Sequence, residues 1–276
     1  MVMSVNTNVS AQVALQNLNA TNAQLSTTQA RINTGLKISS AKDNGAIWAI
    51  AQGQRADIGA LNAVKQSLDR GVAATDVAMA AGETVSDLLL QMKEKALAAT
   101  DKSLKTAARA ALNEDFKALR DQIASVTKNA EFNGVNLLKT AADGFTALAN
   151  AEGTASLTVP AEVMALGSTT VTVAVTQSIE TLTKATASLA AVSASIDNVS
   201  GALARLGTKS KALTTHLSFV GKLSDALEAG VGNLVDADLA KESAKLQALQ
   251  TKQQLGVQAL SIANQTPQLI MSLFRG

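Results

Sequence analysis

Apolar residues recur every seven positions near the start of the chain, at Leu18, Leu25 and Ile32. Seven residues return to the same face of an α-helix, so these side chains form one narrow stripe. Across residues 44–100 the apolar positions are mostly three or four apart, which predicts one long amphipathic helix. The same spacing predicts a shorter helix after the break at residue 101, ending near residue 129.

Helical periodicity stops after this second helix. Asn133 and Gly134 form a turn signal, because both residue types tolerate the positive φ angles of tight turns. The segment that follows is rich in Gly, Thr and Val, and Ser156–Val159 and Thr170–Val175 have the character of strands. We therefore expect a small β-hairpin within residues 140–176, inserted into a helical frame.

The last third of the chain is the most periodic. An apolar stripe predicts a helix over residues 178–228, and Gly230 and Gly232 are expected to interrupt it. A fresh helical pattern is predicted from Leu234. Its leucines lie at seven-residue spacing, with one offset by three: Leu239, Leu246, Leu260 and Leu249.

These elements predict a mainly α protein, a long antiparallel helical bundle or coiled-coil rod with paired terminal helices and a small β-hairpin insertion. We expect residues 1–44 and 234–276 to form an inner domain of terminal helices. Residues 45–139 and 177–233 would form an outer helical rod, with residues 140–176 as its short β insertion.

The two ends of the chain share a lack of charge. Residues 1–30 carry no charged side chain, and beyond Leu246 only Lys252 is charged before Arg275. Exposed helices normally carry Lys, Glu and Arg, whereas burying an unpaired ion costs several kcal/mol. Amides and hydroxyls can instead be satisfied by hydrogen bonds. Both ends are therefore predicted to be covered on all sides by further copies of the chain, in a homo-oligomer.

Composition narrows the classes of function. A net charge of +2 without a basic, aromatic-rich cluster argues against nucleic acid, and no apolar run is long enough to insert in a membrane. Cysteine is absent and His216 is the only histidine, so a two-histidine metal site is excluded. Asp236 and Asp238 are better explained by a helix start than by catalysis. We expect no enzyme activity, no metal and no cofactor.

Motifs at both ends resemble the bacterial flagellins. The N-terminal ones are Asn6-Thr7-Asn8, Arg31-Ile32-Asn33-Thr34-Gly35-Leu36-Lys37-Ile38 and Ser40-Ala41-Lys42-Asp43. The C-terminal ones are Asp236-Ala237-Asp238, Glu242, Gln253-Gln254, Gly256, Leu260, Ala263-Asn264-Gln265, Pro267-Gln268 and Ser272-Leu273. The run from Phe132 to Leu138 is similar to the turn that leads from helix to hairpin in that family. The likeness is to short, alphaproteobacterial flagellins without large outer domains.

The resemblance implies a subunit of the flagellar filament, which serves swimming motility. It further implies secretion through the flagellar type III export apparatus with a chaperone, an extracellular location, and contacts with other flagellins and with hook-associated and cap proteins. The pattern and the resemblance together predict these subunit-interface residues: Leu18, Leu25, Arg31, Ile32, Leu239, Leu246, Leu249, Gln253, Leu260, Ala263, Asn264 and Leu273. The alternatives are a hook-filament junction protein and, from another class, an enzyme on a similar scaffold.

Overall fold

The computed structural model describes residues 7–273, with side chains up to residue 265. The chain forms two compact units, one built from residues up to Ala56 and from Ala226 onward, the other from Asp57–Asp225. The described residues contain five helices and two strands: α1 (Val9–Thr34), α2 (Gly45–Ala99), α3 (Thr106–Asn129), β1 (Phe145–Leu148), β2 (Ser156–Val159), α4 (Leu182–Val235) and α5 (Leu239–Leu273). The mainly α prediction is confirmed, as are the two helices expected in residues 44–129.

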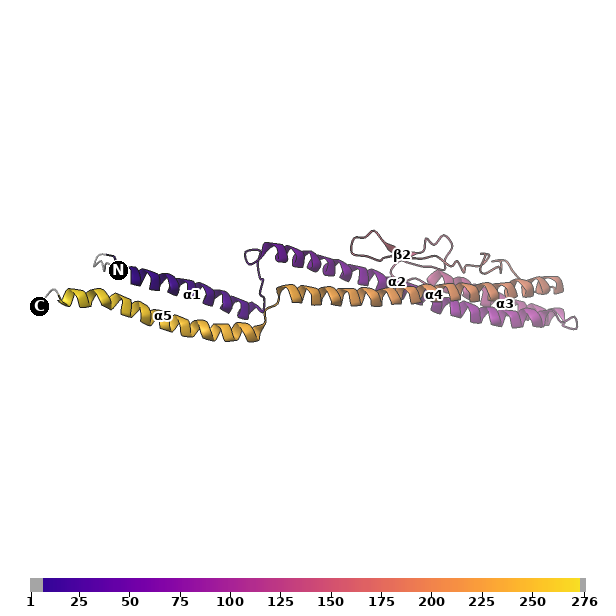
Figure 1. Cartoon of the computed structure of the whole chain (residues 1–276). Coiled ribbons are helices and arrows are strands. Elements are labelled where there is room, and N and C mark those ends of the chain that lie inside the picture. Colours follow the sequence, from indigo (N-terminus) through magenta and orange to yellow (C-terminus); the bar gives the residue numbers. More distant parts are fainter. Residues whose placement is uncertain (1–6, 274–276) are drawn as a thin grey trace. The chain divides into compact units, whose positions relative to one another are not determined.

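In the first unit, α1 and α5 lie side by side (Figure 1). α1 is capped by Asn8, whose side-chain Oδ1 accepts a hydrogen bond from the N–H of Ala11 at 3.0 Å. Such a cap satisfies one of the N–H groups that a helix start leaves without a partner. The helix ends at Gly35, which adopts the left-handed conformation with φ +71°. Glycine adopts this conformation without the steric cost that a Cβ imposes.

The segments that follow α1 and precede α5 are bonded to each other. Leu36 and Asp236 form an antiparallel bridge, and the N–H groups of Lys37 and Ile38 both donate to the carbonyl of Val235. The N–H of Ala237 donates to the carbonyl of Gly35 at 2.8 Å. The ends of the two terminal helices are therefore held together by main-chain hydrogen bonds.

In the second unit, α2 and α4 run antiparallel. Ser210 of α4 donates to the Asp76 carboxylate of α2 at 3.3 Å, and Leu203 of α4 packs against Gly82 of α2. The core of this unit includes Leu68, Leu89 and Met92 of α2, Phe116 and Ile123 of α3, and Leu206 and Leu213 of α4, all at most 1% exposed. This apolar stripe is the one that the sequence predicts.

An ion pair joins the β insertion to α4. The buried Glu162 carboxylate accepts from Arg205 Nε at 2.7 Å and from Arg205 Nη2 at 2.6 Å. The hydrogen bonds to Glu162 hold the pKa of the Arg205 guanidinium above its ordinary value. Because both carboxylate oxygens are bonded, the buried charge is satisfied.

The hairpin is present, but one of its expected strands is not. β1 pairs with β2 in antiparallel register, with Phe145 opposite Val159. Thr170–Val175 was expected to be a strand and is irregular, because its polar groups bond to α4. The N–H of Thr172 donates to Ser195 Oγ at 2.9 Å and its hydroxyl donates to the Ala191 carbonyl at 2.9 Å. The sequence alternates between valine and threonine here because Val171 and Val173 are buried while Thr172 is exposed.

The boundaries of the fourth helix also differ from the prediction. α4 runs through Gly230 and Gly232 to Val235, and α5 begins at Leu239, not at Leu234. A glycine inside a helix costs about 1 kcal/mol relative to alanine. Burial of Val231 and Val235, at 7% and 2% exposure, keeps this stretch helical.

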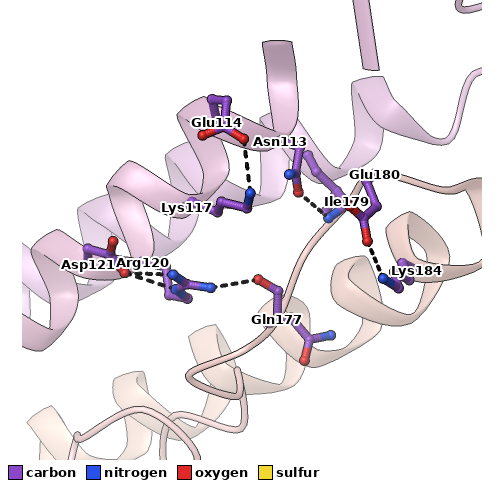
Figure 2. Close-up of polar contacts among 9 residues, drawn as sticks. All are labelled: Asn113, Glu114, Lys117, Arg120, Asp121, Gln177, Ile179, Glu180 and Lys184. Carbon is purple, nitrogen blue, oxygen red and sulfur yellow. Dashed lines mark hydrogen bonds and ion pairs between the residues drawn. The ribbon is translucent and has the colours of Figure 1, made fainter. Parts of the chain in front are cut away.

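The start of α4 lies four residues later than expected, because α3 holds the preceding segment in a non-helical form. Figure 2 shows Asn113 and Arg120 of α3 reaching this segment. The N–H of Ile179 donates to Asn113 Oδ1 at 2.8 Å, and Arg120 Nη1 donates to the Gln177 carbonyl at 3.0 Å. Main-chain groups that would otherwise enter a helix are thus satisfied by side chains.

Two hairpin glycines provide a matched test of backbone strain. Gly144 and Gly153 have φ of +79° and +70°, but a Cβ on Gly144 would lie 2.6 Å from the carbonyl oxygen of Val159, whereas one on Gly153 meets nothing within 4 Å. We expect Gly153→Ala to lower the free energy of unfolding of the second unit by about 1 kcal/mol, from the positive φ alone. Gly144→Ala should cost about 3 kcal/mol, because the clash adds to the strain. Urea unfolding followed by circular dichroism measures both, and equal effects would contradict the assigned clash.

Candidate functional site

The pairing of α1 with α5 buries few side chains. The buried residues of α1 are Thr21 and Thr28, and Leu249 is the buried apolar residue among the described side chains of α5. A helix pair normally buries a continuous stripe of large apolar residues. Within the chain, therefore, these two helices have little hydrophobic stabilisation of their own.

Polar contacts join the two helices along their length. Near the start of α1, Asn8 Nδ2 donates to the carbonyl of Ala263 at 2.7 Å. Further along, Gln253 Nε2 donates to Asn22 Oδ1 at 2.8 Å. At the other end of the pair, Arg31 Nη1 lies 3.1 Å from Glu242 Oε1.

The helices approach closely at Gly256 of α5. A Cβ at this position would lie 3.3 Å from Leu18 Cδ1, so a residue with a side chain would require Leu18 to move by a few tenths of an ångström. A groove of about 250 Å³ lies beside this contact and is lined by Ala14, Asn17, Thr21, Lys252 and Leu255 among others. Glycine at this position lets Leu18 pack directly against the main chain of α5.

The structure places the predicted interface residues in two groups. Most lie partly or fully buried on the paired helices: Leu18, Leu25, Arg31, Ile32, Leu246, Leu249, Gln253, Leu260 and Ala263. Leu239, 49% exposed, and Asn264, exposed, lie outside the buried part of the pair. Leu273 is in α5, but its side chain falls outside the described residues, as does all of Asn6.

Several residues of the pair were not among the predicted interface residues. Asn22 faces Gln253, and Glu242 faces Arg31. Periodicity could not identify Asn22, because an amide within an amide-rich segment carries no distinctive signal. Glu242 did carry one, since it is the only acidic residue from Leu239 to the end of the chain.

A tight loop follows α1 and is built around Asp43. Its Oδ2 accepts from the N–H and the hydroxyl of both Ser39 and Ser40, at 3.0–3.2 Å. The N–H of Ser40, followed by that of Ser39, lowers the pKa of the Asp43 carboxyl below its ordinary value. The carboxylate therefore acts as a local anchor that fixes the path of the chain between α1 and α2.

Large apolar side chains also remain exposed on the terminal pair. Val9 and Val13 of α1 are 62% and 51% exposed, and Leu255 and Val257 of α5 are 59% and 54% exposed. Arg31 is the one charged residue of α1. On α5, the exposed Lys252 lies beside Leu255, so the surface is nearly but not wholly free of charge. A surface with little charge and exposed aliphatic side chains is typical of a protein interface.

The candidate chemical groups have structural partners. His216 Nε2 lies 2.7 Å from the carbonyl of Ala149, and its ring packs 5.7 Å from that of Phe219. Asp238 caps α5 through a hydrogen bond from the N–H of Lys241 at 3.1 Å. In the described part of the chain, no group of three or more His, Cys, Asp or Glu residues is placed to hold a metal ion, and no helix is both long and apolar enough to cross a membrane.

Comparison with known proteins identifies the family. Residues 5–143 match the N-terminal helical region of bacterial flagellin, and residues 189–274 match its C-terminal helical region. Flagellin FljM of Caulobacter vibrioides is 57% identical over 272 residues, which cover 99% of this chain and 98% of that protein. The flagellin of Brucella melitensis is 37% identical over 99% of each chain.

The fold has a solved counterpart at low sequence identity. A protein assigned as flagellar hook-associated, from Vibrio parahaemolyticus, superposes with a TM-score of 0.56 at 17% identity, covering 70% of this chain and 100% of that one. This likeness concerns the fold alone. The two family regions together span most of the sequence, and the Caulobacter and Brucella relatives match it almost from end to end. The chain belongs to the bacterial flagellins.

Proposed function

We propose that this chain assembles through α1 and α5 into the filament of the bacterial flagellum. As a flagellin it is a structural subunit of that extracellular filament, and it polymerises with further copies and with other flagellins. The observation that supports α1 and α5 as the assembling elements is their surface, which is nearly free of charge yet exposes Val9, Val13, Leu255 and Val257.

From this surface we infer a role for each part of the chain. Residues 1–44 and 234–276 form the inner assembling core, residues 45–139 and 177–233 the outer rod, and residues 140–176 the short insertion. The predicted interface residues on both terminal helices then contact neighbouring copies or shape the pair that does so. Most of those with described side chains are only half-buried in the single chain, which leaves apolar area for such contacts.

The same proposal covers the partners and the route of export. We expect the chain to leave the cell unfolded through the flagellar export apparatus with a chaperone, and to meet hook-associated and cap proteins at the filament ends. The chain acts by assembly and has no catalytic role in this proposal. The family is one of structural proteins, which supports this view.

A hook-filament junction protein is not favoured. The curated relatives that match this chain over nearly its whole length include five from Caulobacter vibrioides, and each of these is a flagellin. A junction protein forms a limited ring, whereas a filament subunit forms long tubes. Electron microscopy of the purified chain under polymerising conditions distinguishes the two outcomes.

Leu246→Asp tests assembly through α5. Leu246 is half-buried in the single chain, so in the proposed filament a carboxylate there would lose the rest of its hydration without gaining a partner. We expect long tubes from the unchanged chain and from the volume-conserving control Leu246→Met, and none from Leu246→Asp. Electron microscopy and sedimentation measure this. Tubes formed by Leu246→Asp in normal yield would refute assembly through this face.

A further inference from the structure

An asparagine followed by glycine is chemically unstable, and the sequence contains this dipeptide twice, at Asn44-Gly45 and at Asn133-Gly134. The main-chain nitrogen of the glycine can attack the side-chain carbonyl carbon of the asparagine, because no Cβ on the second residue hinders the approach. The reaction requires that nitrogen and that side-chain amide to be free to move toward each other. The local structure therefore decides which of the two dipeptides reacts.

Asn133 and Gly134 form the exposed tip of a two-residue hairpin. The N–H of Phe132 donates to the carbonyl of Val135, and the N–H of Val135 donates to the carbonyl of Phe132, both at 2.9 Å. Asn133 and Gly134 have φ of +49° and +83°, the positive values that short hairpin loops favour. A Cβ on Gly134 would meet nothing within 4 Å. This tip is therefore open to solvent water on the side of the glycine.

The two reacting groups at this tip have no competing partner. Among the residues that the structure describes, neither the Asn133 side chain nor the main-chain N–H of Gly134 makes a hydrogen bond. Rotation of the Asn133 amide toward the Gly134 nitrogen therefore breaks no bond of either group. Only the two main-chain bonds between Phe132 and Val135 restrain the loop, and exposed loop tips open locally at little free-energy cost.

The other dipeptide is restrained by the start of α2. Asn44 Oδ1 accepts from the N–H of Ile47 at 3.2 Å, and the Asn44 main-chain carbonyl accepts from the N–H of Trp48 at 3.0 Å. Closing a ring with Gly45 would draw the side chain away from the helix end and turn this carbonyl away from Trp48. The helix would lose its cap. As long as this cap is in place, Asn44 is the less reactive of the two asparagines.

We propose that Asn133 is a site of spontaneous covalent modification, at which the chain changes with age and without an enzyme. The Gly134 nitrogen loses its proton and bonds to Asn133 Cγ. The bond between Cγ and Nδ2 breaks, and the side-chain amide leaves as ammonia. Water then opens the resulting cyclic imide at either carbonyl, to give aspartate or isoaspartate. Overall, one water is consumed and one ammonia is released, and the turn gains a negative charge.

The isoaspartate product is expected to fit this turn poorly. Its main chain runs through Cβ and Cγ of residue 133 and so contains one additional carbon atom. A two-residue loop fixes the register of the main-chain bonds beside it, and the longer loop would break the bonds between Phe132 and Val135. Asn136, which follows directly, bonds the end of α3 to the next segment. We therefore expect the isoaspartate form to unfold at a lower urea concentration than Asn133→Asp, which adds the charge without lengthening the main chain.

The test follows the full-length chain during prolonged incubation at mildly alkaline pH, where loss of the Gly134 proton is favoured. Mass spectrometry of peptides locates each exchange of an amide for a carboxyl group, and chromatography of the same peptides separates aspartate from isoaspartate. Isomerisation at Asp143-Gly144 leaves the mass unchanged and so is not counted.

Ala151→Gly is the matched control, because it creates a further dipeptide of the same sequence at Asn150. The Asn150 side chain is bonded: Nδ2 donates to Glu152 Oε2 at 3.2 Å and to Thr154 Oγ1 at 2.7 Å, and Oδ1 accepts from the N–H of Ala155 at 3.0 Å. In the folded variant we expect Asn133 to react at least about tenfold faster than Asn150, whose hydrogen bonds must break first. In urea that unfolds the chain, the two sites should react at similar rates.

Two results would overturn the proposal. One is that Asn133 stays intact in the folded chain over a period in which the unfolded chain reacts, which would show that the turn protects it. The other is that Asn133 and Asn150 react equally fast in the folded Ala151→Gly variant, which would show that the free side chain of Asn133 gives it no advantage. Asn133→Gln provides a check on the chemistry. It keeps the amide but would have to close a larger ring, so the product at this turn should disappear.

Discussion

Val257→Asp is expected to abolish polymerisation while leaving the folded chain as stable as before. Val257 is 54% exposed on α5, so the new carboxylate displaces little packing within the chain. In the proposed filament this surface is covered by neighbouring copies, and an unpaired ion buried there costs several kcal/mol. The critical concentration should therefore rise by at least about 100-fold. Sedimentation and electron microscopy measure assembly, and thermal unfolding measures stability.

The matched control is Val257→Thr, which keeps the branched shape and adds a hydroxyl without charge. Hydroxyls and amides are abundant in both terminal helices, so we expect this variant to polymerise within a few-fold of the unchanged chain. A second control, Ala187→Asp, places the same charge on an exposed position of α4. If Val257→Asp polymerises as well as Val257→Thr, this face of α5 is solvent-exposed in the filament.

Asn136→Ala is expected to cause a large loss of stability in the second unit. The Asn136 side chain is 4% exposed and makes four hydrogen bonds. Its Nδ2 donates to the carbonyls of Thr127 and Lys128 at 2.9 and 3.2 Å, and its Oδ1 accepts from the N–H groups of Leu138 and Lys139 at 2.8 and 3.0 Å.

Asn136 therefore satisfies main-chain groups at the end of α3 and in the next segment at once. Alanine removes all four bonds and leaves buried carbonyls without donors, which should lower the free energy of unfolding by about 3 kcal/mol. Asn136→Asp keeps the shape but turns an oxygen toward the two carbonyls, so it should cost more than alanine. Asn129→Ala, an exposed position with one 3.4 Å contact, should cost less than about 0.5 kcal/mol.

These stability differences are measured by urea unfolding followed at the helical circular dichroism band. An Asn136→Ala effect no larger than that of Asn129→Ala would show that the buried bonds are not needed. Because Asn136 lies in the second unit and Val257 in the first, the two predictions separate cleanly. Asn136 variants should change stability, and Val257 variants should change assembly.

Much of the helical architecture could be predicted from the sequence. The three- and four-residue spacing located α2 and α3 to within a few residues, because burial of one helix face requires that spacing. The Asn133-Gly134 turn is confirmed, with φ of +49° and +83° at its two residues. These features depend on local conformation and on one buried face, which adjacent residues encode.

The errors occur where distant residues decide local structure. The residues around Thr172 alternate between apolar and polar as a strand would. The N–H of Thr172 nevertheless donates to the hydroxyl of Ser195, which lies 23 residues later. Gly232 has the propensity of a helix break, yet α4 continues to the buried Val235. In both cases tertiary contacts outweigh a local preference worth about 1 kcal/mol.

For the terminal helices, too, some properties follow from the sequence and others only from tertiary contacts. By itself, the sequence determined that both ends are helical, nearly uncharged and striped at seven-residue spacing, because these properties depend on residue type and periodicity. Only the tertiary structure decided which residues of the two ends meet: Asn22 with Gln253, Leu18 with Gly256, and Arg31 with Glu242. Periodicity identifies the face that each helix presents, but it does not identify which residue of the other helix lies opposite.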